Sequence, residues 1–241
     1  MEWSEWNPLY SEIVRRLSID SKMDYKATAL LSEMIADINP EPLLHHLGHS
    51  ITGRDVIVCG SGPSLERHVA YISNEPQFKD SVILAADGAI SVLLDYDVGC
   101  HYLVTDLDGE PRDLLASLSK GTIPVVHAHG DNIQNVQKLV PEMGVVLGST
   151  QVIPSSNVFL WGGFTDGDRA CYLAAHYTPR RIILAGMDFG LTVGKWSKPG
   201  HEEHFLASER KRLKLEIAQE LLEYLWESRN IEHSSLDKTI E

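Results

Sequence analysis

The 241-residue sequence contains little cysteine, and the cysteines it has form no recognisable site. The three residues, Cys59, Cys100 and Cys171, are scattered along the chain, and no Cys-x-x-Cys pair occurs. Neither a zinc site nor a disulfide framework is therefore expected. All three lie in apolar surroundings, so we predict that they are buried as small hydrophobic side chains.

Positive charge and long apolar runs are also scarce. The sequence has 21 Lys and Arg against 34 Asp and Glu, a formal net charge of -13, which argues against a basic surface for nucleic acid. No stretch approaches the roughly 18 apolar residues that a membrane span needs. The N-terminus lacks the basic and then apolar plan of a signal peptide. We expect a cytoplasmic protein that binds neither nucleic acid nor membrane.

From about Thr52 onward, short apolar runs alternate with stretches compatible with helices. The runs are Val56 to Cys59, Val82 to Ala86, Tyr102 to Thr105, Ile123 to Ala128, Val145 to Gly148, Val158 to Trp161 and Ile182 to Ala185. Strands that alternate with helices predict a parallel sheet covered by helices. The expected fold class is therefore α/β, with a Rossmann-like, mostly parallel sheet and helices on both faces.

The two ends of the chain are predicted to be helical. Residues 1–49 are expected to form an N-terminal helical cap on an α/β domain of residues 50–241, with helices opening at Asn7-Pro8 and at Asp24. A long terminal helix is expected from about Glu202 to Ser228. The apolar stripe of the N-terminal helices must pack either on the main domain or on a second subunit, so a homodimer is one of the two expectations.

An acidic turn follows the third apolar run, in the order Asp106-Leu107-Asp108-Gly109. Spacing of i, i+2 in an extended segment places both carboxylates on one side. Adjacent like charges repel unless a cation lies between them, and Mg²⁺ prefers carboxylates together with substrate phosphates. The turn therefore indicates a Mg²⁺ and phosphate site. The alternative is a solvated turn in which Asp serves only as a turn former.

A glycine-containing loop, Gly60-Ser61-Gly62-Pro63-Ser64, follows the first apolar run. Its glycines allow close approach to an anion, and the next helix can offer its N-terminal amides. No lysine follows as in a Walker loop, and Leu65 stands where a dinucleotide fingerprint has its third glycine. We predict a phosphate or nucleotide contact, the alternative being a tight turn between strand and helix.

Other strand ends also carry Asp beside Gly. They are Asp87-Gly88, Gly130-Asp131-Asn132, the loop of Gly162 to Arg169 with Asp166, and Gly186-Met187-Asp188. Each could be an ordinary helix cap or turn, and Asp87 could equally hold a ribose. In open α/β sheets, however, ligands bind beyond the carboxyl ends of the strands. We therefore expect these side chains to form one acidic edge that a divalent metal completes.

Taken in order, these motifs resemble the archaeal 6-hydroxymethyl-7,8-dihydropterin diphosphokinases, the MptE-like family. The resemblance rests on Gly-Ser-Gly-Pro-Ser-Leu, Ala-Asp-Gly-Ala, Thr-Asp-Leu-Asp-Gly, His-Ala-His-Gly-Asp-Asn, Gly-Phe-Thr-Asp-Gly-Asp-Arg and Ala-Gly-Met-Asp-Phe-Gly, and it runs from about Gly53 to the terminal helix. More distantly, Ala86 to Gly88 and Thr105 to Gly109 are similar to motifs of thiamine pyrophosphokinases, and Thr165-Asp166 to their later Thr-Asp.

The resemblance implies an ATP-dependent transfer of diphosphate to the hydroxymethyl group of a reduced pterin, with release of AMP, in the synthesis of a tetrahydromethanopterin or folate type of cofactor. Carried over by motif, Asp106 and Asp108 are Mg²⁺ ligands and Asp131 is a third. Thr105 and Gly109 depart from the flanking Gly and Ser of the thiamine enzymes, which leaves the metal geometry open.

The remaining expected roles follow from the same resemblance. The expected catalytic residues are Asp106, Asp108, Asp166 and Arg169. The expected residues for nucleotide and substrate binding are Gly60, Ser61, Gly62, Ser64, Asp87, Gly88, Asp131, Asn132, Asp188 and Lys198. Lys195 is a further candidate cation, Phe189 and Trp196 are candidates for stacking on the pterin, and Gly190 to His204 is expected to be a flap over the site.

Two other functions are compatible with the sequence. A nucleotide-sugar glycosyltransferase would use an Asp-x-Asp pair to hold a metal and a sugar diphosphate, although this chain has no extra domain for a protein acceptor. A regulator that binds a nucleotide without catalysis would use the same Rossmann-like sheet.

Overall fold

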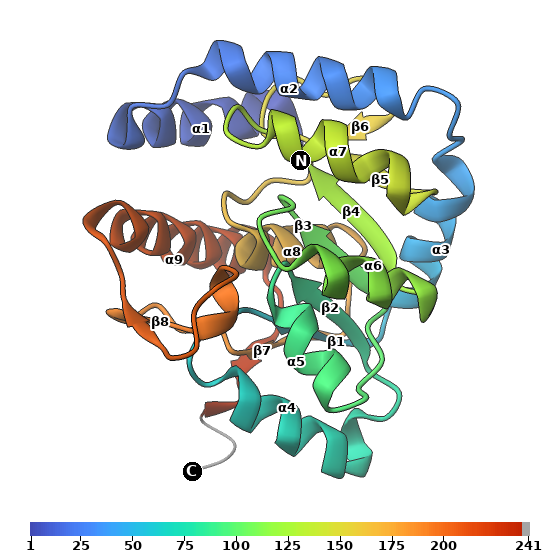
Figure 1. The fold of residues 1–241 in the computed structure, drawn as a ribbon, viewed down its shortest axis with the longest axis vertical. Helices are drawn as coiled ribbons and strands as arrows, with labels where there is room; N and C mark the ends of the chain where they lie inside the picture. The colour runs from blue at the N-terminus through green and yellow to red at the C-terminus, as the bar shows by residue number, and fades with distance from the viewer. Residues whose placement is uncertain (238–241) are drawn as a thin grey trace.

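The computed structural model describes residues 1–237, and within them the chain forms an eight-stranded parallel sheet. Across the sheet the strands are β10 (His233–Ser235), β7 (Arg181–Ala185), β1 (Asp55–Cys59), β2 (Val82–Ala86), β3 (Tyr102–Thr105), β4 (Ile123–His127), β5 (Leu147–Ser149) and β6 (Val158–Phe159). The predicted α/β class with a mostly parallel sheet is confirmed (Figure 1).

The central strands are apolar because helices cover both of their faces, as is usual in parallel sheets. Every residue of β1 and β2 is buried. Side chains alternate along β1, so that Val56 and Val58 join the core on one face and Ile57 and Cys59 join the core on the other.

Helices from both halves of the chain form the two outer layers. One face is covered by α2 (Ser21–Met34), α4 (Leu65–Asn74), α5 (Ala89–Asp95), α6 (Pro111–Ser119) and α7 (Ile133–Met143). The other face is covered by α1 (Trp3–Leu17), α3 (Glu41–Ile51), α8 (Asp166–His176) and α9 (Glu209–Arg229). Two 3₁₀ turns, η1 (Pro76–Phe78) and η2 (Lys195–Ser197), lie between these elements.

The N-terminal helices differ from the prediction in their starting points. Helix α1 begins at Trp3 and contains Pro8, because Trp6 buries its ring in the core and donates its Nε1–H to the Gln151 carbonyl at 2.9 Å. The prediction that Asp24 caps the second helix is wrong. Asp20 is the cap, and Asp24 is buried inside α2.

The apolar stripe of α1 packs against the sheet of its own chain. Its buried side chains Trp6, Tyr10, Ile13 and Leu17 belong to the same core as Val56 of β1. Of the two partners expected for this stripe, the structure shows the main domain. The stripe therefore gives no argument for a second subunit, and the homodimer and the boundary between residues 49 and 50 stay predictions.

The C-terminal region also departs from the expected single helix. Helix α9 begins at Glu209, after Ser208, whose Oγ accepts the Lys211 amide at 3.2 Å. The residues before it form the short antiparallel pair β8 (Thr192–Val193) and β9 (Phe205–Leu206). The edge strand β10 escaped prediction because its residues, His-Ser-Ser, are polar. Within residues 1–237, no helix is both long and apolar enough to cross a bilayer.

The strand order sets the position of the site. Strand β1 has β2 on one side and β7 on the other, so successive strands lead away from β1 in one direction until the chain crosses back through α8 to β7. Ligands of open α/β sheets bind at such a reversal, outside the carboxyl ends of the strands.

Candidate active site

The loops after β1 and β7 meet at this reversal and pack closely against each other. The Gly60 amide donates to the Ala185 carbonyl and the Gly62 amide to the Gly186 carbonyl, each at 2.8 Å. A Cβ placed on Gly62 would lie 2.2 Å from Asp188 Oδ2. Glycine is required at position 62 because no side chain fits between the two loops.

Asp188 bonds to the start of helix α4, where a phosphate was expected. Its carboxylate accepts the Ser64 amide at 2.9 Å and the Ser64 hydroxyl at 2.8 Å. Ser61 donates its hydroxyl to the Ala86 carbonyl at 3.2 Å. In this structure the predicted phosphate-binding loop is therefore satisfied by its own chain, and its contact with a nucleotide stays a prediction.

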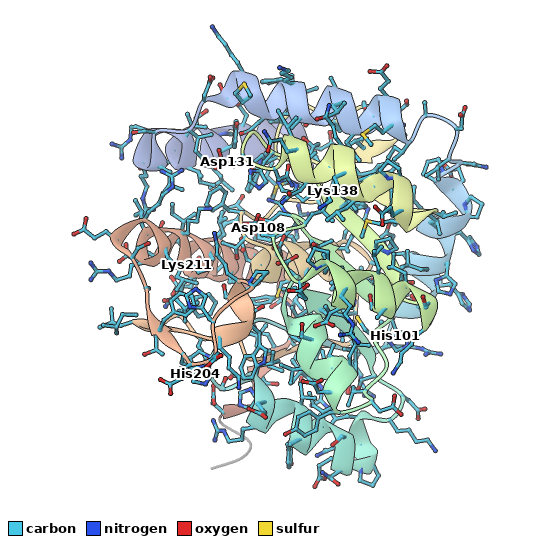
Figure 2. All side chains as sticks on the ribbon, in the orientation of Figure 1. His101, Asp108, Asp131, Lys138, His204 and Lys211 are labelled. Atoms are coloured by element: carbon cyan, nitrogen blue, oxygen red, sulfur yellow. The ribbon has the colours of Figure 1, made fainter. Side chains whose placement is uncertain are left out.

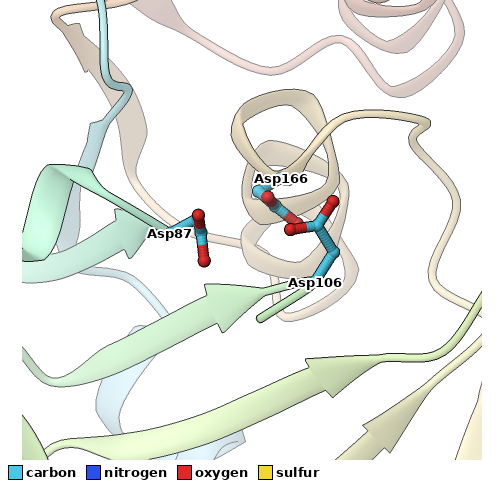
Figure 3. A group of neighbouring side chains, drawn as sticks. All are labelled: Asp87, Asp106 and Asp166. Atoms are coloured by element: carbon cyan, nitrogen blue, oxygen red, sulfur yellow. The ribbon is translucent and has the colours of Figure 1, made fainter. Parts of the chain in front are cut away.

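Three carboxylates gather beyond the next strands, as Figure 3 shows. Asp87 follows β2, Asp106 follows β3 and Asp166 begins α8, and each offers an oxygen that lies within 4.8 Å of the other two. Asp87 was predicted as a ribose contact and Asp166 as a catalytic residue. The structure brings both to Asp106, one of the predicted metal ligands.

The buried Thr105 hydroxyl holds Asp87 in place, and the backbone at Asp87 and Leu107 is strained. Thr105 donates its hydroxyl to Asp87 Oδ1 at 2.5 Å and accepts the Leu107 amide at 2.8 Å. Asp87 and Leu107 both adopt left-handed backbone, with φ of 40° and 66°. Such conformations cost energy in non-glycine residues, and they concentrate at functional sites.

The loop after β4 supports Asp106 from the opposite side. The buried Asn132 side chain donates to the Asp106 carbonyl and to the His127 carbonyl, both at 2.7 Å. His129 Nε2 lies 3.5 Å from Asp106 Oδ2. Asn132 was predicted to bind a ligand, but its amide nitrogen joins two strand ends. It positions Asp106.

The electrostatics of the group favour the binding of a cation. Burial and the charge of Asp106 raise the pKa of Asp87 to about 7. The same two causes raise the pKa of Asp166 well above its ordinary value. Burial also opposes ionisation of Asp106, but the hydrogen bond and charge of His129, the charge of Lys214 and the Asp108 amide together outweigh it and lower the pKa of Asp106.

The donor set fits a hard divalent ion. Within residues 1–237, no lysine or arginine lies within ion-pair distance of Asp87, Asp106 or Asp166. Three carboxylates from separate elements, all oxygen donors, are the ligand type that Mg²⁺ prefers. These three residues are the ones that could hold a metal.

The other two predicted metal ligands lie outside this group. The Asp108 side chain is 43% exposed, and its Oδ2 lies 3.7 Å from Lys198 Nζ. Asp131 is exposed, and its amide donates to His129 Nδ1 at 3.3 Å. Metal ligation by Asp108 and Asp131 stays a prediction. The sequence signal for Asp87 as a ligand was its place at the neighbouring strand end, but that position had been interpreted as a ribose contact.

Arg169 supports the loop that leads into Asp166 at the start of α8. Its guanidinium is buried and donates to the Gly162 carbonyl at 3.4 Å and the Phe164 carbonyl at 3.2 Å. Asp168 completes a capping box with Thr165 at the start of α8. Burial lowers the pKa of Arg169, and the charges of Asp168, Asp166 and Asp106 oppose that shift, while a direct catalytic role stays a prediction.

The segment of Gly190 to His204 packs beside the carboxylates. A Cβ on Gly88, next to Asp87, would lie 1.8 Å from the Trp196 carbonyl oxygen. Lys195 lies 5.2 Å from the Trp196 ring centroid rather than on a carboxylate. Phe189 is half-buried against the core. Sequence reasoning missed Lys211 and Lys214 of α9, whose charges act on this group, because the helix was expected to run from about Glu202 and neither lysine lies in a loop at a strand end.

A parallel α/β sheet with carboxylates gathered at its carboxyl edge places the chain in the class of Rossmann-like α/β proteins, whose ligands bind at that edge. A model of the MptE-like family, described as 6-hydroxymethylpterin diphosphokinase MptE-like, matches residues 31–194. The chain belongs to this family.

Curated relatives extend the match to most of the chain. A protein of Pyrococcus furiosus named 6-hydroxymethyl-7,8-dihydropterin pyrophosphokinase is 43% identical over 225 residues, which cover 93% of this chain and 94% of the relative. A protein of the same name from Methanocaldococcus jannaschii is 37% identical and covers 96% of this chain and 99% of the relative. A third, from Methanothermobacter thermautotrophicus, is 36% identical and covers 93% and 95%.

Proposed function

We propose that this protein transfers diphosphate from ATP to the hydroxymethyl group of 6-hydroxymethyl-7,8-dihydropterin, giving the pterin diphosphate and AMP. Family membership and the names of the relatives support the pterin substrate and the diphosphate transfer. The observation that carries the proposal within the molecule is the group of Asp87, Asp106 and Asp166 at the sheet edge.

Asp87, Asp106 and Asp166 are the residues proposed to hold Mg²⁺. Magnesium bound there would supply positive charge to the phosphates as they develop negative charge. The protein's own contribution is preorganisation: Thr105 fixes Asp87, and Asn132 and His129 fix Asp106. Fixed carboxylates need little reorganisation during the reaction.

The proposed reaction is a displacement at the β-phosphorus of ATP. A bond forms between the pterin hydroxymethyl oxygen and the β-phosphorus, and the bond from that phosphorus to the oxygen of the α-phosphate breaks, so that AMP leaves. The hydroxyl proton must pass to a base. Asp108 is the carboxylate available for this at the rim, because it lies outside the group of three and is partly exposed.

The substrates are proposed to lie on both sides of the carboxylates. The Gly60 to Ser64 loop and the segment of Gly190 to His204 form the side toward β1 and β7. His129 and the half-buried Phe164 lie on the side toward β4 and β6, where a flat pterin ring can stack. In this proposal the segment of Gly190 to His204 covers the phosphates and excludes water from them, which limits hydrolysis of ATP.

One assay tests the proposal. The purified protein is incubated with ATP, Mg²⁺ and reduced 6-hydroxymethylpterin, and the products are separated by chromatography. We expect AMP and pterin diphosphate in equal amounts, and loss of both when EDTA removes the metal. ADP in place of AMP, or turnover of a nucleotide sugar with no pterin product, would refute the proposal, and nucleotide binding without any product would support the regulator.

A further inference from the structure

Three lysines approach the acidic group from the C-terminal part of the chain. Lys198 Nζ lies 3.7 Å from Asp108 Oδ2, and Lys211 donates to the Ser197 hydroxyl at 3.4 Å. Lys214 Nζ lies 5.8 Å from the centroid of the Phe164 ring. Figure 2 labels Lys211 on α9 near the loop that carries Asp108.

Backbone contacts explain why these lysines lie beside the carboxylates. The Trp196 carbonyl packs on Gly88, which directly follows Asp87, so Ser197 is held near that ligand. Phe164 precedes Asp166 by two residues. Lys211 and Lys214 are three residues apart on the first turns of α9, a spacing that places both on one face of a helix.

Within residues 1–237, one of these three lysines has a carboxylate partner and the other two have none. Among residues 1–237, Lys211 and Lys214 form no ion pair, and Lys198 reaches only the partly exposed Asp108. Burial and the charges of Lys214 and Lys198 lower the pKa of Lys211, and the more distant charges of Asp166 and Asp106 offset this only in part. A half-buried ammonium with two like-charged neighbours and one long bond to a hydroxyl is unfavourable, because buried charges need partners.

An anion would remove this cost. If the lysines served only to balance the acidic group, they would be expected to pair with Asp87, Asp106 or Asp166, and they do not. Positive charges that face a metal-binding carboxylate group without contacting it leave room for a ligand that is negative and binds both. A polyphosphate has this chemistry.

We propose that Lys211 and Lys214 form a polyphosphate subsite, closed by Lys198, which binds the β- and γ-phosphates of the nucleotide. The identity of the nucleotide rests on the proposed function, while the anion subsite follows from the lysines themselves. Lys198 exchanges Asp108 for phosphate oxygens when the anion binds, which frees the Asp108 carboxylate at the rim.

The test uses inorganic tripolyphosphate as the probe and isothermal titration calorimetry of the full chain at two matched ionic strengths, with Mg²⁺ and with EDTA. The variants are Lys211→Gln, Lys214→Gln and the double variant. Lys138→Gln is the matched control, because Lys138 is an exposed lysine of α7 (Figure 2). Circular dichroism and thermal melting verify that each variant is folded.

Each single variant should weaken tripolyphosphate binding by about tenfold or more, as loss of a charge-assisted contact does. The double variant should bind more weakly still, and its affinity should depend less on salt. Lys211→Arg should restore part of the affinity. The control should bind like the wild type.

Wild-type affinity in folded Lys211 and Lys214 variants would overturn the subsite, as would equal weakening by Lys138→Gln or absence of tripolyphosphate binding to the wild type. The pterin assay keeps the two proposals apart. If the wild type forms AMP and pterin diphosphate but the lysine variants keep their affinity, only the subsite fails. If no product forms but binding depends on the lysines, only the proposed function fails.

Discussion

Buried aspartates stand at both ends of the central sheet, and the chain treats them in opposite ways. At the amino end of β1, Asp55 accepts Arg180 Nε at 2.6 Å and Arg181 Nη2 at 2.8 Å. These bonds, the one from Arg180 above all, lower the pKa of Asp55. At the carboxyl end, burial and a neighbouring carboxylate raise the pKa of Asp87 and of Asp166.

The difference separates a structural charge from a functional one. At the amino edge the charge of Asp55 is already compensated within the chain, because two guanidinium groups form ion pairs with this one carboxylate. The carboxyl edge concentrates the like charges of Asp87, Asp106 and Asp166, and no lysine or arginine within residues 1–237 forms an ion pair with these three. Such an arrangement destabilises the free protein unless a bound cation offsets it. The comparison can be tested by changing one edge at a time.

The largest effect is expected from Asp106→Asn. The change keeps the shape of the side chain but removes a proposed ligand, so kcat for AMP formation should fall at least about a hundredfold, as with loss of a key transition-state stabiliser. We also expect Mg²⁺ to raise the melting temperature of the wild type and to leave that of the variant unchanged. Steady-state kinetics and thermal melting measure the two effects.

Asp131→Asn is the matched control for that experiment. Asp131 is exposed and lies outside the group of three carboxylates, so turnover close to that of the wild type is expected. An equal loss in both variants would show that the ligand set predicted from the sequence, which included Asp131, is the functional one.

Asp55→Asn should affect stability and leave turnover of the folded protein unchanged. Loss of a charge-assisted partner costs roughly 1–3 kcal/mol, and the lower half of that range is expected because the Arg180 side chain is 65% exposed and screened by solvent. Urea unfolding at pH 7 measures the change in the free energy of unfolding. Asp87→Asn, tested in EDTA, should cause no comparable loss, because it relieves repulsion.

The contribution of Asp55 should vanish in acid. Because its pKa is lower in the folded chain than its ordinary value of 3.8, the folded state favours the charged form. The stabilisation is therefore complete above the unfolded pKa and is lost as the pH falls through the folded pKa. Melting curves of wild type and Asp55→Asn should differ by a constant amount above about pH 5, begin to converge below the unfolded pKa, and meet once the pH is below the folded pKa. A difference that persists in acid would contradict the ion-pair account.

Local sequence pattern predicted most of the sheet and part of the site. Strands such as Val82–Ala86 were predicted because buried parallel strands are continuously apolar. Asp106 was predicted because turns at strand ends lie on the ligand side of the sheet. The strand β10 carries no apolar run and gave no such signal.

Contacts between distant segments were beyond the reach of that pattern. Ser208 is a helix-capping residue type that marks the start of α9 at Glu209, but nothing near Lys211 in the sequence indicates that its side chain reaches Ser197. Asp87 was recognised as a strand-end acid, but its partner Asp166 lies 79 residues later on another element, as their numbering shows. Which acids share a ligand depends on how α8 packs against β2 and β3, and this is a property of the tertiary fold.

The smallest effect is expected from Asp188→Asn. This variant tests whether an aspartate at the ligand edge can have a purely structural role, as Asp55 has at the other edge. Asp188 stands at the ligand edge, yet its carboxylate is bonded to Ser64 as fully as Asp55 is to its arginines. If it serves as a cap for α4, the asparagine still accepts one hydrogen bond, and the loss of stability should be below about 1 kcal/mol with little change in kcat. If Asp188 instead binds a substrate, as the sequence predicted, KM for ATP or for the pterin should rise while the melting temperature stays the same. Steady-state kinetics beside thermal melting decide between the two, because a cap changes stability first and a ligand contact changes KM first.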